Sequence, residues 1–176
     1  MAANATRVPG TPRTYEAQDS ITRPADTNQY AAGDVISDHT TTPTAGGYFT
    51  LSFPGYAAGY GSVMLTDFTL HKSDHDVTNA SFAVLLFTTL PTLLNLDDNG
   101  QCAITDAEML ECKGAVSFGA SGWINAALGD VQTVSQNMGV VMGEDSTVIY
   151  GVLLAADTYT PANAEKFTLT VHGIQD

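Results

Sequence analysis

Two continuous apolar runs constrain this chain more than any other feature of its sequence. The first is Phe82–Phe87 and the second is Val148–Ala155. A strand with one face in water alternates apolar and polar side chains, whereas these runs are apolar almost throughout. They therefore predict strands that are covered on both faces. The outer face of each sheet in a two-layered fold meets water, so such strands need a further cover, such as a partner subunit or the chain's own arm.

The rest of the body alternates with a period of two. In residues 47–53, for example, three apolar side chains share one face and polar side chains occupy the other. Seven or eight short strands of this kind, separated by Gly/Pro turns, are expected between residues 47 and 173. This spacing predicts an all-β fold, a β-sandwich. The long irregular connections at 21–46 and 95–110 favour a jelly roll over an up-and-down barrel.

The N-terminal segment differs from this body. We expect residues 1–20 to form an extended arm and residues 21–176 to form a single β-sandwich domain. Pro9, Gly10 and Pro12 interrupt backbone hydrogen bonding, and few apolar residues are available for packing. A disordered tail is the alternative to an arm that orders on a partner. The basic residues expected to bind a partner's carboxylates are Arg7, Arg13 and Arg23.

The charge balance disfavours two classes of partner. The chain has 19 acidic and 6 basic residues, a net charge of −13. Such a protein repels phosphate backbones and anionic headgroups, so we expect neither nucleic-acid nor membrane binding. No apolar run has the length of a signal peptide or a spanning helix, which predicts a soluble protein made without export. Cys102 and Cys112 are then expected to be reduced structural thiols.

The sequence contains only weak matches to motifs for metal binding or catalysis. The loop that contains Asp97, Asn99 and Asp106 has some of the ligand positions of a calcium loop, but it starts with Asn95 and ends with Asp in place of Glu. An acidic surface turn is the simpler interpretation, so no metal and no cofactor is expected. Thr105 and Glu108 have capping-box spacing, which predicts one short helical turn. We expect no enzymatic activity, although 19 acids leave a pair of catalytic carboxylates open.

Aromatic residues leave one binding alternative open. They could form a sugar-stacking platform, although aromatic residues in the turns of β proteins more often cap the core. The four residues concerned are Tyr48, Tyr56, Tyr60 and Trp123.

Several stretches resemble the jelly-roll decoration, or cement, proteins on the capsids of tailed bacteriophages. They are ITRPADTNQYAAGDVI at residues 21–36, FAVLLFTTLP at 82–91 followed by Asp97 to Asn99, and IYGVLLAAD at 149–157 followed by YTPA at 159–162. The resemblance covers most of residues 21–162. These phrases consist of turns and core strands and include no functional site.

This resemblance implies a non-enzymatic virion protein, assembled in the host cytoplasm. Such a protein binds the outside of the major capsid protein shell, typically as a homotrimer at three-fold or quasi-three-fold positions. We expect the trimer to form through the faces of residues 82–88 and 148–155. The apolar residues expected to make oligomer or core contacts are Phe82, Val84, Leu86, Ile149, Val152 and Leu154. The alternative is a receptor- or glycan-binding module of a phage tail or baseplate.

Overall fold

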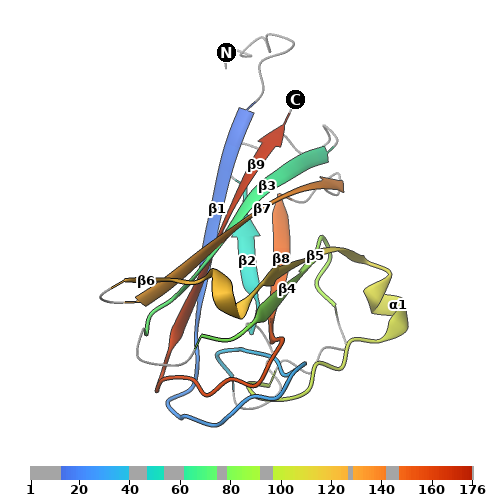
Figure 1. Ribbon diagram of the computed structural model, residues 1–176. Coiled ribbons are helices and arrows are strands. Elements are labelled where there is room, and N and C mark those ends of the chain that lie inside the picture. The colour runs from blue at the N-terminus through green and yellow to red at the C-terminus, as the bar shows by residue number, and fades with distance from the viewer. Residues whose placement is uncertain are drawn as a thin grey trace, which may run out of the picture.

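Two antiparallel sheets pack face to face in the computed structural model (Figure 1). The structure describes residues 13–39, 47–53, 62–74, 79–91, 97–126, 129–141 and 147–175. One sheet has the strand order β1-β9-β3-β7-β6, and the other has the order β2-β8-β4-β5. The strands are β1 (Arg13–Thr22), β2 (Phe49–Ser52), β3 (Ser62–Lys72), β4 (Phe82–Phe87), β5 (Cys112–Phe118), β6 (Ile124–Ala126), β7 (Gly129–Val141), β8 (Val148–Ala155) and β9 (Lys166–Gln175).

The pairing of these strands is that of a jelly roll. With the short edge strand β6 left aside, the first strand pairs with the last (β1 with β9), and the second pairs with the last but one (β2 with β8). The third and sixth strands pair (β3 with β7), as do the fourth and fifth (β4 with β5). The chain is thus one long hairpin rolled up, and the β3–β9 and β4–β8 pairings close it. The predicted jelly-roll sandwich is confirmed.

The first strand corrects the predicted arm. Residues 13–20 belong to β1, which pairs with β9 from Arg13↔Gln175 to Thr22↔Lys166. Ala17 and Ile21 are buried on one face, so a period-two pattern was present but short. The Asp19 Oδ2 accepts a hydrogen bond of 2.6 Å from the Thr50 N–H, which fastens this edge strand to β2 of the other sheet. Residues 1–12 lie outside the described residues.

The main core lies between the two sheets. It is built from the side chains on the inward faces of the strands. Along most strands, these apolar residues alternate with polar residues that face water on the other side. The aromatic centre is Phe82, whose ring meets the rings of Trp123, Tyr159 and Phe167 edge to face. Four of the predicted contact residues are buried in this core: Phe82, Val84, Leu86 and Ile149.

A second apolar cluster covers the outer face of the four-stranded sheet. Its buried centre is Val35, Phe87 and Val152. The cover comes from this same chain: Cys102 and Ile104 of the β4–β5 connection pack against the cluster. The predicted residues Val152 and Leu154 belong here, Leu154 being half-buried.

Backbone hydrogen bonds hold this cover in place. The N–H of Ile36 donates to the Leu153 carbonyl (2.9 Å), and the N–H of Gly33 donates to the Ala155 carbonyl (2.8 Å). Residues 33–36 therefore continue the sheet beside β8, where β2 has ended. On their other side, the Val35 N–H donates to the Gly100 carbonyl (2.8 Å). Segments distant in the chain therefore cover the centre of the face that was expected to form the trimer contact, while Leu85, Tyr150 and Leu154 stay half-buried around it.

One short helix, α1 (Asp106–Met109), lies in the β4–β5 connection. The Thr105 side chain accepts from the Glu108 N–H, and the Glu108 side chain accepts from the Thr105 N–H, so the predicted capping box is confirmed. A single 3-10 turn, η1 (Ala120–Gly122), precedes Trp123. Within the described ranges, no helix is long and apolar enough to cross a membrane.

The second cluster predicts a stability effect. Phe87→Ala is expected to lower the free energy of unfolding by about 3–5 kcal/mol, because it opens a cavity among side chains that water does not reach. Urea denaturation measures this. The exposed Leu110→Ala control is expected to change stability by less than about 0.5 kcal/mol. A Phe87→Ala loss as small as that of the control would mean that the outer face is wet in the isolated chain.

Candidate functional site

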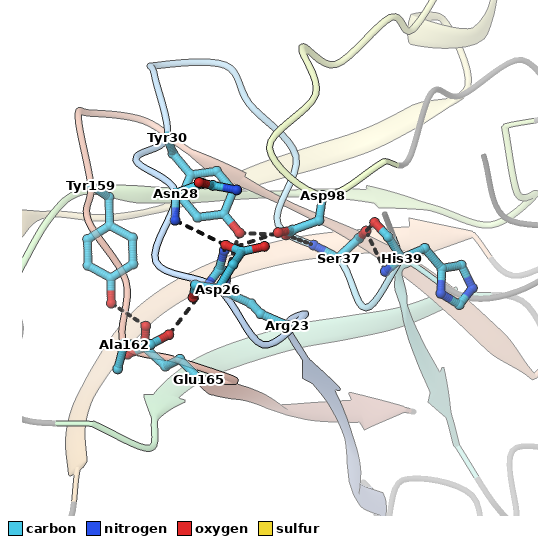
Figure 2. A network of polar contacts seen from close by, with 10 residues as sticks. All are labelled: Arg23, Asp26, Asn28, Tyr30, Ser37, His39, Asp98, Tyr159, Ala162 and Glu165. Carbon is cyan, nitrogen blue, oxygen red and sulfur yellow. Dashed lines mark hydrogen bonds and ion pairs between the residues drawn. The ribbon is translucent and has the colours of Figure 1, made fainter. Parts of the chain in front are cut away.

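Polar side chains converge at one end of the sandwich, where three connections of the chain meet (Figure 2). Arg23 follows directly after β1. Around it lie the β1–β2 connection with Tyr30, the β4–β5 connection with Asp98, and the β8–β9 connection with Ala162. We refer to Arg23, Asp26, Tyr30 and Asp98 as the Arg23 cluster.

The Arg23 guanidinium has an acceptor for each of its five N–H groups. Its Nη1 donates to the carbonyl oxygens of Asp26 and Ala162, both at 3.2 Å. Its Nη2 donates to Asp26 Oδ1 and Asp98 Oδ2, both at 3.1 Å. Its Nε donates to the Tyr30 hydroxyl. The side chain is fully buried, so this complete set of partners is what makes burial of the charge tolerable.

Tyr30 connects the guanidinium to the carboxylate. Its hydroxyl accepts from Arg23 and donates to Asp98 Oδ1 at 2.5 Å. Burial, together with the hydrogen bond and the charge of Asp98, raises the pKa of the Tyr30 phenol. Tyr30 therefore keeps its proton and its role as a donor. Asp98 Oδ1 also accepts from the Ser37 N–H (3.0 Å).

The guanidinium keeps its charge in this setting. Burial alone would lower the pKa of Arg23, but its contacts with Tyr30, Asp98 and Asp26 together raise that pKa. The guanidinium carbon also lies 4.8 Å from the centroid of the Tyr30 ring. Burial raises the pKa of the partner carboxyl of Asp98, although its contacts with Tyr30, Ser37 and Arg23 act in the opposite direction.

Local turns place the acids of this cluster. Asp26 Oδ1 accepts from the Asn28 N–H (3.0 Å), a turn that fixes its carboxylate toward Arg23. Asp98 lies in a turn closed by the bond from the Gly100 N–H to the Asp97 carbonyl (3.0 Å). Asn99, the next residue, has a positive φ of 61°, a conformation that asparagine tolerates better than most residues.

This turn includes two residues of the calcium hypothesis. With its amide nitrogen facing acceptors, Asn99 donates to Asp34 Oδ2 (3.2 Å) and to the Gln29 carbonyl (3.0 Å). Asp106 instead lies in the first turn of α1. Among the described residues, no group of three or more His, Cys, Asp or Glu side chains could hold a metal ion. The structure therefore assigns Asn99 to the support of the turn.

A second buried pair lies beside the Arg23 cluster. The Tyr159 hydroxyl donates to Glu165 Oε2 at 2.5 Å (Figure 2). Burial raises the pKa of the Glu165 carboxyl, although the Tyr159 hydrogen bond and the charge of Lys72 act in the opposite direction. Burial, together with the charge of and hydrogen bond to Glu165, raises the pKa of Tyr159. The Glu165 backbone carbonyl accepts from the Arg23 N–H (3.0 Å), which links the two groups.

Lys72 and Asp130 form a third buried charge pair. They lie directly opposite each other in the β3–β7 ladder, with Nζ 2.8 Å from Oδ2. Both side chains are fully buried. Nζ also donates to the Asp74 carbonyl (3.0 Å) and lies 5.8 Å from the centroid of the Trp123 ring. The Lys72 ammonium group is thus part of the interior.

These three groups are suited to holding loops together and unsuited to catalysis. Arg23, Tyr30, Tyr159 and Glu165 are all buried, so a substrate cannot approach them. The Arg23 donors are already used, and the two phenols keep their protons. They can hold the end of β1 and the start of β9 against the connections that surround them.

The predicted partner-binding arginines fall in different places. Arg23 was expected to reach a partner from an arm, and this is wrong, because its guanidinium is enclosed by its own chain. Arg13 is exposed at the start of β1. Arg7 lies outside the described residues.

The sugar-stacking platform does not assemble around Trp123. Its ring is buried, and its Nε1 donates to the Ala80 carbonyl (3.0 Å). The Tyr48 ring meets Tyr150 edge to face against the second cluster. Tyr56 and Tyr60 lie outside the described residues. Trp123 therefore belongs to the core, as capping aromatics do.

Sequence reasoning missed the buried charges. These charged residues and their hydrogen-bonding partner Tyr30 lie in segments with the sequence pattern of ordinary polar turns and strand ends. The charged residues are Asp98, Glu165, Lys72 and Asp130. One signal was present: a chain with only six basic residues places Arg23 directly before Pro24, at a strand end. The acceptors of that arginine could not be read, because Asp98 is 75 positions away in the sequence.

Comparisons with known proteins give little guidance. No family model matches the sequence, and no curated protein matches it. Among solved structures, one similar chain comes from a full particle of Israeli acute paralysis virus heated to 63 degrees. The identity is 10%, the TM-score is 0.35, and the alignment covers 100% of this chain and 81% of that chain. A likeness at this TM-score carries no argument about function.

The Arg23 cluster predicts a large stability effect. Asp98→Ala is expected to lower the free energy of unfolding by about 3–5 kcal/mol, because it leaves a buried guanidinium without its charge partner. Urea denaturation measures the loss, with the exposed Asp157→Ala as a control that changes little. Adding Arg23→Met to Asp98→Ala should cost less than the sum of the two single losses. A loss below about 1 kcal/mol for Asp98→Ala would contradict a buried pair.

Glu165 predicts a pH-dependent effect. Its raised pKa means that the folded chain holds the proton more tightly than the unfolded chain, so the carboxylate costs stability at neutral pH. That cost disappears as the pH falls through the raised pKa toward the ordinary value of 4.5. Glu165→Gln is therefore expected to raise the melting temperature at neutral pH, and the gain should shrink on acidification. A gain that is equal at neutral and acidic pH would contradict this.

Proposed function

We propose that this chain is a non-enzymatic virion protein, a capsid decoration or cement protein. It binds the outside of a shell built by a major capsid protein, as a homotrimer at three-fold or quasi-three-fold positions. It assembles in the host cytoplasm and stabilises the shell against internal pressure. The observation that carries the proposal is the jelly-roll topology, a fold common among virion proteins.

Three further features support this role. The stretches at 21–36, 82–91 and 149–162 that resemble decoration proteins form the segments 33–36, β4 and β8, which together build the second cluster. The buried charge pairs tie the loops at one end of the sandwich, which suits a protein that must resist strain. The charge of −13 keeps many copies on one particle soluble and mutually repelled.

The trimer of this proposal uses a surface other than the one expected from the sequence. The faces of β4 and β8 are filled by the main core and the second cluster. Light scattering is expected to give three times the 18.5 kDa of one chain. A value of one chain at micromolar concentration would remove the trimer from the proposal while leaving decoration to be tested on particles.

Particles of the virus that carries this sequence test the decoration role. Particles stripped of the chain should bind the purified protein on their outer surface, visible in an electron microscopy map. They should also survive a higher temperature with the protein than without it, since a ligand of the assembled shell stabilises it. Bovine serum albumin, also acidic, serves as the control. Recovery of the chain with tails, combined with binding on a glycan array, would instead establish the receptor- or glycan-binding alternative.

A further inference from the structure

The short helix α1 stands apart from the rest of the molecule. Figure 1 shows it at the outer end of the β4–β5 connection, away from both sheets. None of its residues is buried. It nevertheless ends in two consecutive large apolar residues, Met109 and Leu110, which are 41% and 84% exposed. Neither side chain contributes to the core, so packing does not explain why they are apolar.

The segment is ordered without core contacts of its own. Its capping box satisfies the N–H groups of Thr105 and Glu108. The Met109 N–H donates to the Thr105 carbonyl (2.9 Å), and the Glu111 N–H donates to the Glu108 carbonyl (3.0 Å). Its two ends are anchored, because Ile104 and Cys112 pack against the second cluster. A segment that is already ordered loses less conformational entropy when it binds a partner.

Acidic residues flank this apolar pair in the chain. Asp106, Glu108 and Glu111 belong to the same segment, and Lys113 lies 3.4 Å from Glu111. Exposed apolar residues are ordinary when they are scattered singly. Two adjacent ones on a preformed turn, with charges around them, have the arrangement of an interface anchor and its polar rim. We refer to Asp106–Met109 with Leu110 and Glu111 as the α1 ridge.

We propose that the α1 ridge is the docking surface of this chain. It inserts Met109 and Leu110 into an apolar pocket bordered by Lys or Arg side chains on a partner protein. Given the proposed function, on which this identification of the partner rests, that pocket lies on the outside of the capsid shell. The acidic rim selects a basic border through charge complementarity.

A second copy of this chain suits the ridge less well than a partner with a basic border. Of its described bases, Arg23 and Lys72 are buried inside their own chain. The described bases that remain outside are Arg13, Lys113 and Lys166, and Lys113 already pairs with Glu111. With 19 acids in each chain, two copies would bring like charges together at this ridge.

The test measures binding to particles stripped of the chain. The probe is the purified full-length protein, and the variant is Met109→Ser with Leu110→Ser. The matched control is Ile124→Ser, because Ile124 is 69% exposed on β6, on the opposite side of the molecule (Figure 1). Removing an apolar anchor is expected to weaken binding at least about tenfold, whereas the control binds as the wild type does. Urea midpoints equal to the wild type confirm that both variants fold.

Two further measurements complete the test. Added salt should weaken wild-type binding, and Asp106→Asn with Glu111→Gln should reduce that salt dependence. Light scattering should give every variant the oligomeric state of the wild type. If the wild type binds and the double-serine variant binds equally well, the ridge is not the docking surface. If that variant changes the oligomeric state, the ridge is a contact between copies. If the wild type itself fails to bind, the decoration role falls, and the partner named here falls with it.

Discussion

The ion pair between Arg23 and Asp98 is the interaction on which one whole end of this jelly roll depends. A guanidinium without water requires an acceptor for every N–H group, and three connections of the chain supply them. Each acceptor ties its connection to the end of β1. The end of β1, the turn at Asp98 and the connection into β9 are thus joined by one side chain, in addition to the backbone hydrogen bonds between them.

Charge and apolar cover are coupled in this structure. The turn that carries Asp98 also delivers Gly100 to the segment at 33–36, which in turn lies beside β8. That segment places Val35 in the second cluster and Ile36 in the main core. The same turn that completes the ion pair thereby helps to seal the outer face of the four-stranded sheet. It follows that this chain itself covers apolar residues for which the sequence predicted either a partner subunit or an arm as the cover.

Much of the fold could be predicted from local patterns. The alternation at residues 47–53 and the helical turn after Thr105 follow from periodicity and capping, which depend on neighbours in sequence. β1 was missed because only Ala17 and Ile21 carry its buried face, directly after a Pro/Gly-rich segment. The buried charges were missed for a different reason. A polar residue in a turn has the same local sequence pattern whether its side chain is solvated or is paired with a buried guanidinium.

Local patterns in the sequence were enough to predict a sandwich of short strands, two of them apolar on both faces. The period of apolar side chains and the placement of turn residues are set over a few positions, so strands and turns can be predicted from the sequence. The tertiary structure alone decided what covers the two apolar strands and which charges enter the interior. Those outcomes depend on residues such as Arg23 and Asp98, which meet only after the hairpin has rolled up.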